Sequence, residues 1–197
     1  MDDLGDGVAA ALSEFSALYG TKLVRKQVFD VLWIPPQGNV IVSAVDCPKG
    51  MPADFVSVGH AKLRRVVRDG VGDYPQPINL FPSIEKIYRS TWGVVVELGF
   101  LTDTGSVKYE RMRLDCLRTE PFHVGGKDAV DGVLHPFSIT IRLKGGDDEL
   151  SWEPELSLHS SSTEAHNPVP SLYDAHFRSA IEVRDLKRLR KKLVALI

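Results

Sequence analysis

Two carboxylates separated by one residue, Glu153 and Glu155, are the side chains whose spacing comes nearest to a catalytic arrangement. In an extended strand, residues two apart point to the same face. Acidic side chains paired in this way can bind a divalent metal ion for attack on a phosphate, and Asp115 would act with them. Such a site needs a second acidic pair on a facing strand, which the sequence does not supply, and Pro154 favours an edge position. The pattern therefore favours solvated carboxylates at a sheet edge.

A second acidic pattern, formed by Asp30, Asp46 and Lys49, is similar to that of metal-dependent nucleases. That chemistry needs an acid and a lysine two positions apart on one strand face. Here the spacing is one residue too long, and Pro48 interrupts the strand. A metal-dependent phosphohydrolase, of the tunnel triphosphatase or the nuclease type, is therefore the alternative interpretation and not the favoured one.

The other polar groups form no recognisable set. The six histidines are scattered, and none accompanies a serine or cysteine in a nucleophile motif. Gly125-Gly126-Lys127 lacks the glycine spacing of a phosphate-binding loop, and we interpret it as a turn between strands. For Cys47 and Cys116 we favour two reduced, buried thiols over a disulfide, and they lack the spacing of a zinc site. The sequence predicts no catalytic residue, no metal site and no cofactor.

The elements that would position these groups are mostly strands. Four strands are predicted over 93–101, 106–117, 136–144 and 150–158, joined by turns rich in Gly, Asp and Thr. In the third strand Phe137, Ile139, Ile141 and Leu143 alternate with polar residues, which predicts one packed face. We expect an antiparallel sheet that curls or closes into a β-barrel.

Helices and a hairpin are predicted around this meander. The apolar spacing predicts a helix over 8–19, and β-prone segments 23–33 and 39–45 predict a hairpin with a turn at 35–38. Periodicity does not decide between strand and helix for 56–68. Further helices are predicted over 82–90 and 172–197, the latter either continuous or broken near Val183, and 160–170 is predicted to be a loop. The fold class is mainly β (α+β), in one domain of 197 residues, with sub-sheets 1–68 and 83–197 joined by the Pro- and Gly-rich connection 69–82.

Composition excludes several classes of function. Hydrophobic residues make up 43% and charged residues 25%, ordinary values for a globular protein. The net charge of −2 provides no global attraction to nucleic acid, so direct nucleic-acid binding is not expected. The sequence has no signal core and no apolar run long enough to span a membrane, which predicts an intracellular protein.

The last segment combines an apolar stripe with basic flanks. Leu186, Leu189 and Leu193 recur at helical spacing among six basic residues between 184 and 192. We favour a helix docked on its own sheet, and docking to an acidic partner or to a phosphate backbone are the other interpretations. As partner-facing residues we name these three leucines together with Phe137 and Trp152 of the sheet, although each could equally belong to the core.

Taken in order, these segments resemble the family of subunit 18 of the Mediator head module. The resemblance rests on a strand at 26–32, the return at 40–42, the run Gly99-Phe100-Leu101-Thr102-Asp103-Thr104-Gly105 continuing to Tyr109, the strand at 150–156 and the ending at 184–189. It implies a triphosphatase-like β-barrel without catalytic acids, paired with a related β-barrel subunit and tethered by a partner's helix. The function predicted is that of a non-catalytic scaffold subunit of a nuclear transcription complex, acting through protein–protein contacts.

Overall fold

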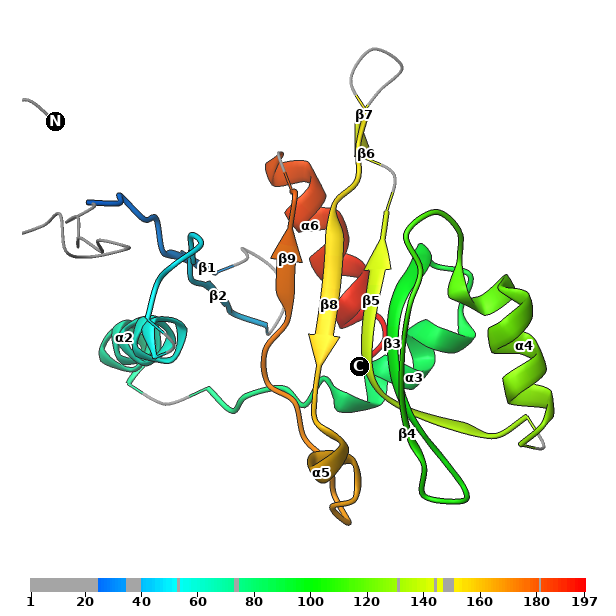
Figure 1. Ribbon diagram of the computed structural model, residues 1–197. Coiled ribbons are helices and arrows are strands. Elements are labelled where there is room, and N and C mark those ends of the chain that lie inside the picture. The colour runs from blue at the N-terminus through cyan, green and yellow to red at the C-terminus, as the bar shows by residue number, and fades with distance from the viewer. Residues whose placement is uncertain are drawn as a thin grey trace, which may run out of the picture. The chain divides into compact units, whose positions relative to one another are not determined.

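The computed structural model of the chain describes residues 25–34, 40–52, 54–72, 75–130, 132–143, 145–146, 151–180 and 182–197. The chain divides into two compact units, residues 1–76 and 77–197, and the division falls inside the predicted connection 69–82 (Figure 1). No helix in the described part of the chain is both long and apolar enough to cross a membrane. The predicted helix over 8–19 and the turn at 35–38 lie outside the described residues.

The first unit contains a two-stranded antiparallel pair and a helix. β1 (Val31–Trp33) pairs with β2 (Val42–Ala44), as the predicted hairpin requires. The segment that periodicity left undecided is a helix, α2 (Phe55–Val71), which ends at Gly72 in the left-handed conformation that glycine adopts readily. Gly59 lets α2 approach β2 closely, because a Cβ at that position would lie 2.8 Å from the Val45 side chain.

The second unit is built on a five-stranded antiparallel sheet with the order β4-β3-β5-β8-β9. Its strands are β3 (Val94–Thr102), β4 (Val107–Arg111), β5 (Leu134–Arg142), β8 (Glu155–His159) and β9 (His176–Arg178). A short ribbon of β6 (Gly145–Gly146) and β7 (Ser151–Trp152) extends from it. Over the described residues the sheet is open, with β4 and β9 at its edges, and does not close into a barrel. The fold is a mixed α+β arrangement, and the predicted antiparallel sheet is present.

Two helices cover one face of this sheet. Figure 1 shows α3 (Phe81–Arg89) and α6 (Val183–Val194) behind the strands. Their apolar side chains, among them Ile84, Ile87, Leu189 and Leu193, pack with those of β3, β5 and β8 into one core. The predicted helix over 82–90 is confirmed, and the closing helix is confirmed from Val183 onward. Leu189 and Leu193 are buried, so α6 docks on its own sheet.

A β-bulge alters the alternation predicted for β5. Phe100 pairs with Pro136 and Gly99 pairs with Ser138, so Phe137 is an extra residue between two pairs. Because of this shift Phe137 packs against Gly99 and Tyr109 and not in the core cluster that contains Ile139 and Ile141. A strict period of two cannot anticipate an inserted residue.

The predicted strand 106–117 ends at Arg111, and the predicted strand 150–158 is divided into β7 and β8. In three further segments local capping or tertiary pairing outweighs composition. Gly125, Gly126 and Lys127 lie inside a helix, α4 (Pro121–Asp128), whose first turn is fixed by Pro121 and by the Glu120 side chain accepting from the His123 amide. The predicted loop 160–170 contains a short helix, α5 (Ser162–Ala165), capped by Ser161. Residues 176–178 of the predicted closing helix instead form β9, paired with β8.

The two cysteines also depart in part from expectation. Both are free thiols, but Cys47 is exposed and Cys116 is only half-buried. The Cys116 sulfur accepts a hydrogen bond from the Val95 amide at 3.3 Å, which gives it a structural role at the start of β3.

Candidate functional site

The edge strand β4 presents backbone groups that no described residue pairs with. Every second residue of β4 forms backbone hydrogen bonds with β3. The Met112 amide donates to the Val96 carbonyl, and the Ser106 carbonyl accepts from the Thr102 amide. Residues 106, 108, 110 and 112 therefore face β3. The N–H and C=O groups of Val107, Tyr109 and Arg111 face outward, and no hydrogen bond to them is found within the described residues. An unpaired edge of this kind is a template for another strand.

Apolar side chains surround this edge. Tyr109 is 69% exposed, and its ring stands edge-on to buried Phe137 at 5.4 Å between centroids. Beyond the end of β4, Leu114 and Phe122 are 90% and 80% exposed. Phe122 also lines a hollow of about 260 Å³, together with Glu110, Arg111, Met112, Leu117 and Glu120. We call Val107–Arg111 with Leu114 and Phe122 the β4 edge surface.

Charges of both signs lie at the β4 edge surface and beside it, among them Glu120 of the hollow. Lys108, Arg111 and Arg113 are exposed along or just after the strand, whereas Asp115 is an exposed acid of the same segment. Arg111 contacts Glu97 of β3 at 2.9 Å, and Glu110 is engaged with His123. Lys108 and Arg113 lie outside these pairs, and an extended segment that combines apolar and acidic side chains complements them.

The residues predicted to face a partner lie mostly in the interior. Phe137, Leu189 and Leu193 are 0%, 1% and 7% exposed, so all three belong to the packed interior of the second unit. Leu186 is 43% exposed and remains accessible. Trp152 lies in β7, and its side chain is outside the described part of the structure.

The predicted carboxylate pair contacts a single arginine. Arg142 of β5 contacts Glu155 at 3.2 Å and Glu153 at 3.4 Å. Asp115 is an exposed loop residue in the segment between β4 and η1 (Leu117–Thr119). No group of three or more His, Cys, Asp or Glu side chains in the described residues is arranged to hold a metal ion. The metal-dependent alternative requires acids that converge on one ion, whereas Glu153 and Glu155 form ion pairs with Arg142.

The nuclease-like acids of the first unit are engaged by backbone amides. Asp30 accepts from the Asp46 amide at 3.3 Å, and Asp46 accepts from the Phe29 amide at 3.4 Å. These bonds connect the segments flanking β1 and β2, so the two carboxylates hold the chain together locally. Lys49 contributes its backbone carbonyl, which accepts from Lys26.

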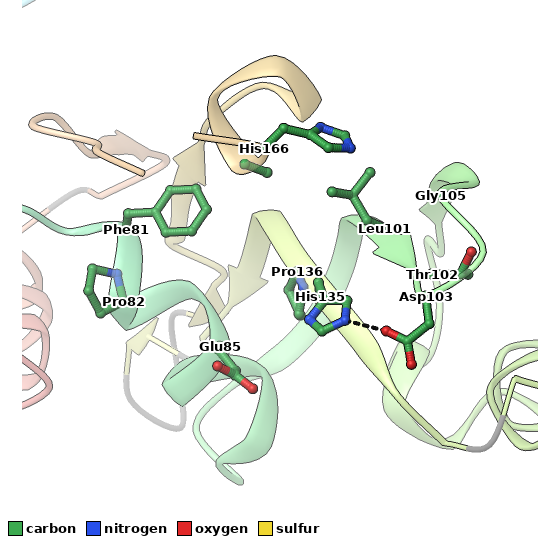
Figure 2. Close-up of a pocket in the computed structure, with 11 residues that line it drawn as sticks. Phe81, Pro82, Glu85, Leu101, Thr102, Asp103, Gly105, His135, Pro136 and His166 are labelled. Atoms are coloured by element: carbon green, nitrogen blue, oxygen red, sulfur yellow. Dashed lines mark hydrogen bonds and ion pairs between the residues drawn. The ribbon is translucent and has the colours of Figure 1, made fainter. Parts of the chain in front are cut away.

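A larger hollow, of about 500 Å³, lies at the end of the sheet where β3 turns into β4. Figure 2 shows that it is bounded by the start of α3, the β3–β4 turn, the start of β5 and the end of α5. Its polar side chains are those of Glu85, Thr102, Asp103, His135 and His166, and its apolar wall includes Phe81, Leu101 and Pro136. We call this site the histidine hollow.

Both imidazoles of the histidine hollow are held by hydrogen-bond acceptors. The Nε2 of His135 lies 2.6 Å from Asp103 Oδ1, and the Nδ1 of His166 lies 2.6 Å from the Ser162 carbonyl. Carboxylates and carbonyls only accept, so these two ring nitrogens donate. Sequence reasoning missed this pairing, because β5 and the β3–β4 turn are 32 residues apart.

A second histidine cluster, around His123, lies in the interior and has a structural role. His123 is 2% exposed and contacts Tyr88 at 2.8 Å and Glu110 at 2.5 Å. Burial raises the pKa of Tyr88, and the charge of Glu110 raises it further. The phenol therefore stays protonated and donates to His123, while the imidazole donates to Glu110.

Polar residues also line the sheet surface on the side of Gly99. Thr140 contacts Glu97 and Ser157, and Ser138 contacts His159 at 2.7 Å, across three neighbouring strands. Burial lowers the pKa of His159, and His176, with ring centroids 6.1 Å apart, lowers it further. Ser138 and Ser157 are buried, so this row joins strands and exposes little reactive surface.

Comparison of the chain with protein-family models, with curated protein sequences and with solved structures finds no match in any of the three.

Proposed function

We propose that this chain is a non-catalytic protein-interaction module in which the β4 edge surface takes up an extended segment of a partner protein. The single observation that supports this is the open edge of β4, whose Val107, Tyr109 and Arg111 offer outward N–H and C=O groups beside exposed apolar side chains. Strand addition gains its affinity from main-chain bonds and its specificity from pockets for alternate side chains.

The surroundings of β4 specify the kind of segment it accepts. Phe122 and the hollow next to it accommodate an apolar side chain, and Lys108 and Arg113 favour acidic neighbours. The proposed ligand is therefore an extended peptide with apolar and acidic residues in alternation. Membership of a nuclear transcription complex, with a related β-barrel subunit and a tethering helix as neighbours, is a separate proposal that comes from the resemblance to the Mediator subunit.

Selection of displayed random dodecapeptides on the full chain tests the proposal. Tyr109→Pro removes one outward N–H and leaves the bonds to β3 intact, because residue 109 does not donate to β3. Tyr109→Val loses the same ring and keeps the N–H, so it is the matched control. We expect selected peptides to bind Tyr109→Pro at least tenfold more weakly than Tyr109→Val.

Two results would refute this function. Equal binding of the selected peptides by both variants would exclude strand addition at β4. A stable dimer of the free wild-type protein that becomes monomeric in Tyr109→Pro would show that a second copy, and not another protein, covers the edge. Sedimentation of both variants distinguishes these cases.

A further inference from the structure

We propose that the histidine hollow binds a cationic hydrogen-bond donor, an ammonium or guanidinium group carried on an apolar stem. The first support is the character of its polar groups. The carboxylates of Asp103 and Glu85 accept hydrogen bonds and carry negative charge, and the donating nitrogens of His135 and His166 are already engaged by Asp103 and by the Ser162 carbonyl. A ligand that satisfies such a set has to donate several hydrogen bonds.

The lining also excludes an anionic ligand. No lysine or arginine is among the described residues that line the hollow. The start of α3 provides no spare amides nearby, since the Phe81 amide donates to Asn79 at 3.0 Å, Pro82 has none, and the Ser83 amide donates to Leu80 at 3.0 Å. The positive end of this helix is thus already capped, and it provides no free amide for a phosphate or carboxylate.

The shape of the hollow fits a cation on a short apolar stem. A volume of about 500 Å³ is within the range of small-molecule sites. Phe81, Leu101 and Pro136 provide an apolar wall, and Figure 2 shows Phe81 on one side with His135 and Asp103 on the other. Phe81 offers a ring face to a cation. Glu85 already binds a guanidinium, that of Arg89 at 2.5 Å, which leaves its second oxygen for a ligand.

Titration of the full chain with n-butylguanidinium, followed by amide chemical shifts in NMR spectra, tests this inference. We expect shifts at 101–105, 135 and 166. The neutral isostere n-butylurea should bind at least tenfold more weakly, because it lacks the charge that Asp103 and Glu85 recognise. Asp103→Asn should weaken n-butylguanidinium about tenfold, and Asp115→Asn, an exposed acid outside the hollow, should leave the affinity unchanged. Glu85→Gln tests the same affinity with a second carboxylate and does not disturb the Asp103–His135 pair.

The source of the cation is distinguished by a second probe, a capped tripeptide with a central arginine. Tighter binding of the tripeptide than of n-butylguanidinium assigns the hollow to an arginine side chain of a partner, and weaker binding assigns it to a small molecule. Equal binding of n-butylurea, or unchanged affinity in both Asp103→Asn and Glu85→Gln, would overturn the inference. Tyr109→Pro is expected to bind n-butylguanidinium like the wild type, so failure at the β4 edge surface and failure here are separable.

Discussion

At the scale of single residues, the buried polar groups stabilise the second unit. His123, Tyr88 and Glu110 form a fully paired network around an almost inaccessible imidazole, next to Phe100 at 6.0 Å between ring centroids. A buried polar group that loses its partner retains its desolvation cost, so each member of such a network depends on the others.

Tyr88→Phe tests this network. The substitution removes the hydroxyl that donates to His123 and leaves one buried nitrogen without a partner, which should lower the free energy of unfolding by about 1–3 kcal/mol. Tyr173→Phe, at a 57% exposed position, is the control and should change it by less than about 0.5 kcal/mol. Urea denaturation measures both variants. Equal stabilities would show that the hydroxyl contributes nothing to the fold.

His159 gives the second unit a pH dependence whose sign follows from its lowered pKa. The unfolded chain, with a histidine pKa near 6.5, takes up the proton before the folded chain does. The stability that the neutral His159 imidazole contributes is therefore fully present above about pH 6.5, and it is lost as the pH falls through the folded-state pKa. We expect His159→Gln to show a shallower decrease in thermal midpoint between pH 7 and pH 5 than the wild type. Parallel profiles for the two proteins would contradict this assignment.

At the scale of elements, one arginine joins the end of α3 to the start of β3. Arg118 donates at 2.8 Å to the carbonyls of Ile87, Tyr88 and Gly93, and at 3.2 Å to that of Trp92. The last carbonyls of a helix have no partner within the helix, so the guanidinium satisfies them and neutralises the negative end of the dipole.

Arg118→Lys should therefore destabilise the second unit although it keeps the charge. A lysine ammonium cannot reproduce the planar fork, and we expect the free energy of unfolding to fall by about 1.5–3 kcal/mol. Arg113→Lys, at an exposed position, serves as the matched control in the same denaturation experiment. A loss of the same size in both variants would assign the effect to arginine content and not to the cap.

The sequence predicts elements well where the pattern is local and long. The apolar spacing of 82–90 and the alternation in 136–144 and 150–158 identify α3, β5 and β8, because burial of one face imposes those periods. Prediction from the sequence fails where a tertiary contact determines the local structure. β9 forms by pairing with β8, and the bulge at Phe137 follows from the register of β3 and β5.

The candidate sites were harder to anticipate. Glu153 and Glu155 were identified by their spacing, but their partner Arg142 comes from another strand. The pairing of Asp103 with His135 has no local signature, and the exposure of Tyr109 depends on β4 being at the edge of the sheet. The exposed Phe122 offered one usable signal, an aromatic residue next to a helix-starting proline.

At the scale of the whole molecule, the second unit has a core of its own. All residues of the buried apolar cluster, and those packed against it, come from between Ile78 and Leu196. A unit of this size with its own core should fold independently.

We expect the fragment 77–197 to unfold cooperatively, with a urea midpoint close to that of the same unit in the full chain. Near-ultraviolet circular dichroism, which reports the packing of aromatic residues such as Trp92, should be retained. A fragment without a cooperative transition would show that residues 1–76 are needed for the core.

Amide hydrogen exchange in β4, measured by NMR on the full chain with and without a selected peptide, tests the account most directly. In the unbound protein we predict rapid exchange for Val107, Tyr109 and Arg111 and slow exchange for Lys108 and Glu110, and all five should be slow when the peptide is bound. Slow exchange of the three outward amides in the unbound protein, or no added protection on binding, would contradict the proposal that β4 is an open edge that receives a partner's strand.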